Sequence, residues 1–204
     1  MGEIFYQIAM TQKAQIINEV IRTRRSIFQN QYSGEKVADE VIEAMIENAN
    51  WAPTHKLTEP WRFIVFTGAG LEQLAQGQAQ LYKQVTEADG TFKQERYDNL
   101  LNKPRLSSHI IAVAMKRDEK KSVPEMEELG AVYCAVQNML LTAAAYDVGC
   151  YLSTGGITYF DESRSLFGLG PDDKLIGFLH VGMMKGDLPA GRRKPVSEKV
   201  NWVR

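Results

Sequence analysis

Apolar residues recur along the chain at two spacings, one typical of helices and the other of buried strands. A first helix is predicted after Thr11, which can cap it, because apolar residues at positions 16, 17, 20 and 21 share one helical face. A second helix is predicted to open at Ser33 and to end before Pro53. Continuous apolar runs predict strands at 62–67, 110–115, 150–153 and 175–182, and a further helix is expected at 69–82.

A long helix of about 26 residues is predicted to begin within Ser122–Glu125 and to run to Gly149, which would serve as its C-terminal glycine. The run Ser122-Val-Pro-Glu125 fits a capping box with proline in the first turn. From Ala131 onward this helix is apolar on nearly all sides. A helix without a polar face must be buried all round, which a subunit interface achieves most easily in a protein of this size.

Helices and strands alternate irregularly, which predicts an α+β fold with a mixed, mainly antiparallel sheet flanked by helices. The 204 residues suit one domain, 1–204. Its last part, 188–204, contains two prolines and is predicted to be an extended arm. The polar stretch 83–107 shows no clear chemistry, and a mobile flap or lid is the role considered for it.

The composition argues against nucleic acid and anionic membranes as partners, and it points to no particular ligand. Twenty-four basic and 25 acidic residues give a net charge of −1, so no bulk field recruits nucleic acid or an anionic membrane. No signal peptide or membrane span is evident, so a cytoplasmic location is predicted, with Cys134 and Cys150 as reduced core residues. The three histidines show no metal-ligand spacing, and His109 and His180 are expected in the core.

The loop 52–61 is a candidate binding surface. Two prolines bracket it, it contains no glycine, and positions 54, 55, 56 and 58 all carry hydrogen-bond donors. Trp61 and Phe63 can fasten its far end to a core. A rigid loop with many donors commonly presents a binding surface, and an ordinary surface connection between a helix and a strand is the equal alternative.

Two arginine clusters are candidates for an anion site. Arg24-Arg25-Ser26 follows the first helix, and Arg192-Arg193-Lys194 lies near the other end of the chain. Guanidinium groups bind phosphate oxygens in pairs, so the two clusters fit one shared dianion. The alternatives are a solvated helix end, where positive charge offsets the helix dipole, and an unremarkable basic tail.

Two glycine-rich turns follow predicted strands. Ser153-Thr154-Gly155-Gly156 would let a flat ligand approach the main chain, although a turn that needs positive φ is the alternative. Gly68-Ala-Gly70 is only part of a dinucleotide-binding pattern, because Gln73 occupies the position of the third glycine.

Five segments in this order resemble the nitroreductase family of FMN-dependent oxidoreductases, in its compact branch with a His-Lys loop. They are Arg24-Arg25-Ser26, the run Ala52-Pro-Thr-His-Lys56 with Pro60-Trp-Arg-Phe63, the helix from Gly130 to Gly149, Gly177-Phe-Leu-His-Val-Gly182, and Arg192-Arg-Lys-Pro195 before Val200-Asn-Trp202. The resemblance covers nearly the whole chain. It implies a homodimer with FMN at the subunit interface and a C-terminal arm exchanged between subunits.

The resemblance also implies which residues bind the cofactor. Arg24, Arg25, Ser26 and Arg193 would hold the phosphate and ribityl chain. Trp51, Thr54 and His55 would reach the flavin from the other subunit. Leu152, Ser153, Thr154 and Gly155 would pass beside the isoalloxazine ring. No residue is expected to act as a general acid or base, because FMN supplies the chemistry.

The implied activity is ping-pong transfer of hydride from NADH or NADPH to a nitroaromatic, quinone or similar acceptor. Four positions depart from the usual family residues, namely Phe28, Leu57, Glu59 and Tyr151. The ring contacts and the substrate are therefore left open. The alternatives are a reductive dehalogenase or flavin-consuming enzyme on the same scaffold, a non-catalytic FMN-binding or sensing module, and a flavin-free interaction protein.

Overall fold

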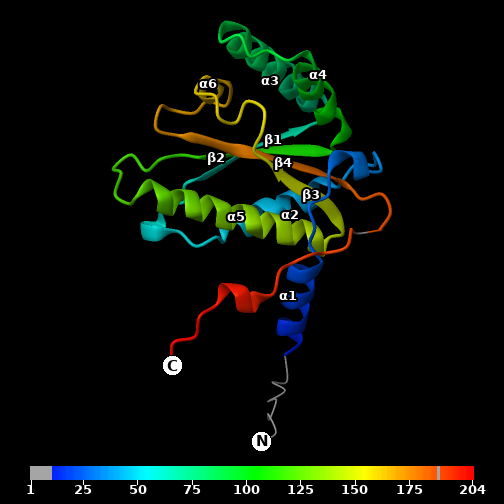
Figure 1. Ribbon diagram of the computed structural model, residues 1–204, viewed down its shortest axis with the longest axis vertical. Helices are drawn as coiled ribbons and strands as arrows, with labels where there is room; N and C mark the ends of the chain where they lie inside the picture. The colour runs from blue at the N-terminus through cyan, green and yellow to red at the C-terminus, as the bar shows by residue number, and fades with distance from the viewer. Residues whose placement is uncertain (1–10, 188) are drawn as a thin grey trace, which may run out of the picture.

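The computed structural model describes residues 11–187 and 189–204, in which helices cover both faces of one β-sheet (Figure 1). The elements are α1 Gln12–Thr23, α2 Asp39–Asn50, β1 Trp61–Thr67, α3 Ala69–Ala88, α4 Gln94–Asn102, β2 His109–Met115, α5 Glu125–Ala145, β3 Val148–Ser153, α6 Ser163–Leu166 and β4 Lys174–Met183. Figure 1 shows α3 and α4 on one side of the sheet and α2 and α5 on the other. The predicted α+β class is confirmed.

The sheet has four strands in the order β1-β2-β4-β3. All three strand pairs of the described residues are antiparallel. The mainly antiparallel sheet that was predicted is therefore present, and these pairs include no parallel one. All four predicted strands are present, with ends displaced by one or two residues. Because β3 is an edge strand, one side of it is available to a ligand or to another chain.

The central strand β2 is buried along its whole length because it separates two hydrophobic cores. Its residues Ile111, Val113 and Met115 join the core formed with α2 and α5. Ile110 and Ala112 join the second core, under α3. This alternation follows from the two-residue period of a strand. A sheet covered on both faces explains why the apolar runs in the sequence are continuous.

A β-bulge between Val113 and Ala114 interrupts the pairing of β2 with β4. It lies opposite Gly177, whose φ is +155° and whose place could not hold a side chain, because a Cβ would come within 2.4 Å of the carbonyl oxygen of Ser153. Only glycine fits this close approach. The bulge therefore brings β4 directly against the end of β3, where the predicted ring contacts begin.

Helix α2 begins at Asp39, so the predicted start at Ser33 is wrong. The preceding segment stays extended because its backbone donors bind elsewhere. The N–H of Ser33 donates to the carbonyl of Met183 at 2.9 Å, and the N–H of Val37 donates to the hydroxyl of Ser108 at 2.8 Å. These bonds tie the segment to the sheet, and a helix would break both of them.

The predicted capping box of α5 is also wrong. The helix begins at Glu125 with Pro124 as its N-cap, and no side chain caps it. Ser122 lies in the preceding turn, where its N–H donates to the carboxylate of Asp118 at 2.8 Å. Residues 120–124 are therefore committed to a turn before the helix can start.

Helix α5 ends at Ala145, four residues before the predicted glycine. The chain reverses through Asp147, whose φ of +55° gives the left-handed conformation that often follows a helix. Gly149 instead lies inside β3. In the single chain α5 also has an outer face with exposed Tyr133 and Cys134, so Cys134 is not a core residue, whereas Cys150 is buried as predicted.

The polar stretch 83–107 is largely helical. It comprises the end of α3, which runs to Ala88 instead of residue 82, the helix α4, and a 3-10 turn at Lys103–Leu106. The amide of Gln78 donates to the carbonyl of Leu100 at 2.9 Å and joins α3 to α4. The two helices form a hairpin over the end of the sheet (Figure 1).

The C-terminal segment 189–204 contains no strand and only one 3-10 turn, at Val196–Lys199. It runs away from the sheet on the side of α1 (Figure 1). Its apolar residues Val196, Trp202 and Val203 are exposed in the single chain. The extended arm was predicted from residue 188, which lies outside the described residues.

Replacement of Gly182 by alanine is expected to destabilise the fold by about 1–3 kcal/mol, because a Cβ there would lie 2.4 Å from the ring of Tyr32. Urea unfolding measures the change. Gly70→Ala is the control, since a Cβ on Gly70 meets only ordinary contacts at 3.9 Å. Equal stability of Gly182→Ala and the parent would contradict this packing.

Candidate functional site

The Arg24-Arg25-Ser26 segment is fixed against the beginning of β3. Arg24 caps the end of α1. The N–H of Ile27 donates to the carbonyl of Cys150 at 3.3 Å. The hydroxyl of Tyr32 lies 3.0 Å from the carbonyl oxygen of Ile27 and 2.9 Å from that of His180. Both the segment and its orientation therefore depend on contacts with the sheet.

Arg24 and Arg25 line a small cavity of about 50 Å³ between the end of α1 and the end of α5. Ala144 and Cys150 line the same cavity. Ser26 follows and is exposed. The structure thus keeps the first predicted phosphate cluster together on one surface.

Arg25 holds the root of the C-terminal arm. Its Nε donates to the carbonyl of Pro189 at 3.0 Å, and its Nη1 donates to the carbonyls of Arg22 at 2.7 Å and Arg24 at 2.9 Å. A Cβ on Gly191 would collide with this guanidinium, so the arm passes directly over it. Arg25 therefore acts on the arm and has few donors left for an anion.

Arg193 lies two residues further along the same arm and is exposed. Its Nη1 donates to the carbonyl of Arg192 at 2.7 Å. Between the described residues, no hydrogen bond joins Arg193 to Arg24 or Arg25. The structure brings the arm to the first cluster through Arg25, and it does not join the two clusters directly.

A second, larger cavity of about 240 Å³ lies between the α3–α4 hairpin and the end of the sheet. Its lining residues are Gln29, Gln78, Tyr82, Arg96, Asn99, Leu100, Lys103, Pro104, Tyr151, Ser153, Gly155, Gly156, Phe178 and His180. Two of the predicted ring contacts, Ser153 and Gly155, are among them. The predicted contacts Leu152 and Thr154 are not, because side chains along a strand alternate between its faces.

The floor of this cavity is a buried polar network. Nδ1 of His180 lies 2.8 Å from Nε2 of Gln29, and the hydroxyl of Tyr151 donates to Oε1 of Gln29 at 2.6 Å. The rings of Tyr151 and His180 stack with centroids 4.9 Å apart. This network orients the floor without any charged group.

Burial keeps both rings of the floor neutral. It lowers the pKa of His180 to about 4, with a further contribution from the positive charge of Lys103. It raises the pKa of Tyr151 to about 12. At neutral pH the formal charges of the cavity are therefore those of Arg96 and Lys103, because no carboxylate lines it.

The predicted binding loop is rigid and is anchored to the start of α5. Nδ1 of His55 lies 2.5 Å from the carboxylate of Glu127, and Nζ of Lys56 donates to the carbonyl of Ser122 at 2.7 Å. Trp61 is buried, as predicted, and its indole donates to the side chain of Asn50 at 3.1 Å. The loop therefore holds its shape without any ligand.

Two other predicted contacts lie on or beside this loop. The hydroxyl of Thr54 lies 3.2 Å from that of Thr58. Trp51, at the end of α2, is 78% exposed, and its indole donates to Glu47 at 3.0 Å. An exposed indole of this size is unusual on a monomer surface and is typical of an interface.

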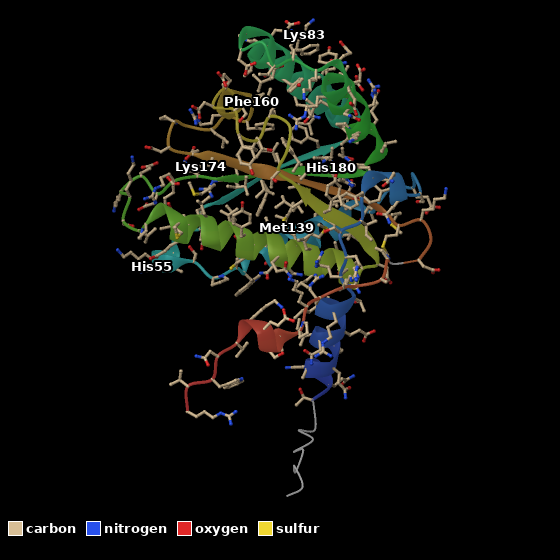
Figure 2. The ribbon with its side chains drawn as sticks, viewed as in Figure 1. His55, Lys83, Met139, Phe160, Lys174 and His180 are labelled. Carbon is tan, nitrogen blue, oxygen red and sulfur yellow. The ribbon has the colours of Figure 1, made fainter. Side chains whose placement is uncertain are left out.

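Two parts of the predicted site lie at opposite ends of α5. His55 contacts the first turn of the helix at Glu127, whereas Arg24 shares a cavity with Ala144 in its last turn. Seventeen residues of helix separate these positions, a rise of about 25 Å. Figure 2 shows His55 at the end of α5 that is remote from α1. One chain therefore cannot bring both residues to one small ligand.

The sequence interpretation missed several residues of the larger cavity. Arg96, Asn99 and Lys103 lie in the stretch that was left without chemistry, and His180 was taken only as a core residue. The spacing of the first three was a usable signal, because residues three, four and seven apart share one helical face.

The chain is an α+β protein with an antiparallel sheet and a polar cavity beside it, and the comparison with known proteins specifies the family. The chain matches the model of the Nitroreductase family over residues 21–183 and belongs to this family.

Three known proteins show how far the similarity extends. "Putative NAD(P)H nitroreductase YfhC" of Bacillus subtilis (strain 168) is 28% identical, over 90% of this chain and 92% of that protein. A nitroreductase-like protein from Bacillus cereus has a TM-score of 0.77 at 27% identity, covering 96% of this chain and 99% of that one. A "putative nitroreductase in complex with fmn" from Desulfovibrio desulfuricans has a TM-score of 0.67 at 25% identity. The match covers 92% of this chain and 96% of that one.

In the part of the chain that the structure describes, no helix is long and apolar enough to cross a membrane. Across residues 11–187 and 189–204, no group of three or more His, Cys, Asp or Glu side chains could hold a metal ion.

The stability of the protein is expected to fall as the pH is lowered from about 6.5 to about 4. In this range the unfolded chain protonates His180, whereas the folded protein keeps it neutral, because its pKa is lowered to about 4. At pH 4.5 this group alone costs about 2–3 kcal/mol.

Urea unfolding at pH 7.5 and 4.5 measures this loss, with His180→Gln as the comparison. Burial also lowers the pKa of His109, so the variant should retain part of the pH dependence and lose the share due to His180. An unchanged pH dependence in the variant would contradict the assignment.

Proposed function

We propose that this protein is an FMN-dependent oxidoreductase that takes hydride from NADH or NADPH and reduces nitroaromatic, quinone or similar acceptors. The observation that carries the proposal is the 240 Å³ cavity, in which Ser153 and Gly155 face two cations and no carboxylate. Membership of the Nitroreductase family, the FMN bound to one similar structure and the NAD(P)H in the name of one relative support it.

The residues present fit the cofactor. A flat ring needs backbone that it can approach closely, and the turn at Gly155 and Gly156 offers this without side chains. A ring that becomes negatively charged on reduction needs a nearby cation, and Lys103 lines the same cavity. We assign the ring to this cavity, beside Ser153 and Gly155, with Leu152 and Thr154 completing that segment.

We assign the phosphate to Arg24 and Ser26, with Arg193 completing the charge from the arm. Arginine pairs well with a phosphate dianion because its donors match the oxygens in geometry. Arg25 contributes indirectly, since it holds the arm at Pro189. Asp147 lines the same cavity, but no ion pair joins it to either arginine among the described residues, so Arg24 keeps its charge available to an anion.

We propose a homodimer in which Trp51, Thr54 and His55 serve the flavin bound mainly by the other subunit. The exposed face of α5, with Tyr133 and Cys134, provides the contact surface. If two copies of α5 pack antiparallel, the first turn of one lies beside the last turn of the other. This arrangement places His55 of the partner subunit near Arg24, which a single chain cannot do.

The arm 189–204 is proposed to wrap around the partner. Its exposed Val196, Trp202 and Val203 would be buried there. We further propose that the chain forms a single domain that carries this arm. We also propose that the protein lies in the cytoplasm, where reduced nicotinamides are available.

Bound FMN would supply the two-electron chemistry, accepting hydride from a reduced nicotinamide and passing electrons to the acceptor in alternating half-reactions. The ammonium group of Lys103 would lie in the same cavity as the ring and would favour negative charge on it. Gln29 and Tyr151 fix the floor on which the ring or substrate rests. No residue is assigned as an acid or base, because the open cavity admits protons from water.

The proposal is tested with Arg24→Gln and two ligands, FMN and riboflavin, which lacks the phosphate. The variant is expected to bind FMN about 10- to 100-fold more weakly, because a charge-assisted hydrogen bond is lost, and riboflavin about as well as the parent does. Fluorescence titration gives both dissociation constants.

The same loaded parent must lose its flavin absorbance when mixed with NADH or NADPH and regain it with a quinone. A parent protein that binds no FMN, or whose flavin is reduced by neither nucleotide, would contradict the proposed function. Equal loss of FMN and riboflavin binding in Arg24→Gln would contradict the role of Arg24 at the phosphate.

A further inference from the structure

One face of α4 and the turn after it is directed at the larger cavity. Arg96, Asn99 and Lys103 lie three, four and seven residues apart and all line it. Arg96 and Lys103 are separated by seven residues, a rise of about 10 Å along the helix. The two cations therefore start from different parts of the cavity wall and can serve different groups of a ligand.

The guanidinium of Arg96 has no carboxylate partner among the described residues. Three arginines of the described residues do have one, as shown by Arg105 with Glu72 at 2.8 Å and Arg164 with Asp161 at 2.7 Å. Arg96 differs from the other unpaired arginines in lining the larger cavity, which Arg24 and Arg25 do not. Acidic residues flank Arg96 on the same helix, yet Asp98 accepts a hydrogen bond from Gln94 instead. Arg96 thus keeps its five donors free beside a cavity that contains no acid.

Lys103 lies at the inner end of this face. Its charge reaches His180 on the buried floor and helps to lower the pKa of that histidine. Arg96, which is exposed as Lys103 is, lies at the opposite end of this face, where a molecule entering from solvent can meet it. One cation suffices for the reduced ring, so the second is left for a charge on another molecule.

We propose that Arg96, assisted by the amide of Asn99, binds an anionic oxygen group of the substrate that enters this cavity next to the flavin ring. The group is a carboxylate, sulfonate or phosphate, carried either by an aromatic acceptor or by the reduced nicotinamide dinucleotide. The enzyme therefore selects anionic over neutral substrates. This inference rests on the proposed function and adds the substrate class to it.

Arg96→Gln and Arg96→Lys test the proposal against the parent. Lys93→Gln is the matched control, because Lys93 precedes the same helix, is exposed and does not line the cavity, so the net charge changes equally. The first experiment uses acceptors: 4-nitrobenzoate and neutral 4-nitrobenzamide are each titrated into the protein as purified, and binding is measured by calorimetry. The second experiment compares flavin reduction by NADPH with reduction by uncharged 1-benzyl-1,4-dihydronicotinamide.

In Arg96→Gln the preference for the anionic over the neutral compound should fall about tenfold in at least one experiment, which corresponds to about 1.4 kcal/mol. Arg96→Lys should retain part of it, and Lys93→Gln should match the parent. A lower preference in the first experiment identifies the acceptor as the source of the anion. A lower preference in the second experiment identifies the nucleotide.

Unchanged preference in both experiments would overturn the proposal, and so would an equal fall in Lys93→Gln, which would indicate a general effect of charge. The titration does not depend on flavin. Selective binding of the anion to a protein that holds no FMN would therefore contradict the proposed function while leaving the anion site in place.

Discussion

The length of α5 is the constraint on which the proposed site depends. It holds the His55 loop at one end, through Glu127, and the Arg24 surface at the other, beside Ala144. A rigid helix of this length cannot bend to bring the two together. Either the two surfaces serve different ligands, or a second copy of the chain completes each site. The exposed apolar residues on α5 and on the arm favour the second explanation.

A buried polar network connects this helical framework to the cavity. Tyr32 joins the segment after Arg24 to β4, because its hydroxyl bonds to the carbonyls of Ile27 and His180. The side chain of His180 continues through Gln29 to Tyr151. The two halves of the site within one chain, the arginine surface and the ring cavity, are therefore fixed to the same two strands. A substitution in one half is therefore expected to alter ligand binding in the other, since the hydrogen bonds of such networks act cooperatively.

Much of the fold could be predicted from the sequence, because the sheet is covered on both faces and its strands are continuous apolar runs. The start of α2 and both ends of α5 could not. The start of α2 is decided by bonds to distant partners, such as that from Val37 to Ser108, the start of α5 by the turn that Ser122 forms with Asp118, and its end by the left-handed backbone of Asp147. Local spacing contains no information about such partners. Strand pairing was predicted only in general terms for the same reason, since the bulge at Gly177 depends on contact with Ser153.

The candidate site was predictable where it followed motifs and not where it depended on packing. The structure keeps Arg24 and Arg25 together, as expected, but it turns Arg25 toward the arm through the carbonyl of Pro189. The cations of α4 were missed because their cavity exists only when the hairpin folds over the sheet. The helical spacing of Arg96, Asn99 and Lys103 shows that they share a face, but not that this face meets a cavity.

Subunit complementation tests the shared site most directly. Arg24→Gln and His55→Ala subunits are each purified as homodimers, mixed under conditions that allow exchange, and titrated with FMN. The account predicts that each variant alone binds FMN weakly at both sites. A mixed dimer should regain one site of parental affinity, built from the intact Arg24 of one subunit and the intact His55 of the other. If mixing restores no binding although heterodimers form, or if a monomer binds FMN with full affinity, the site does not lie between subunits.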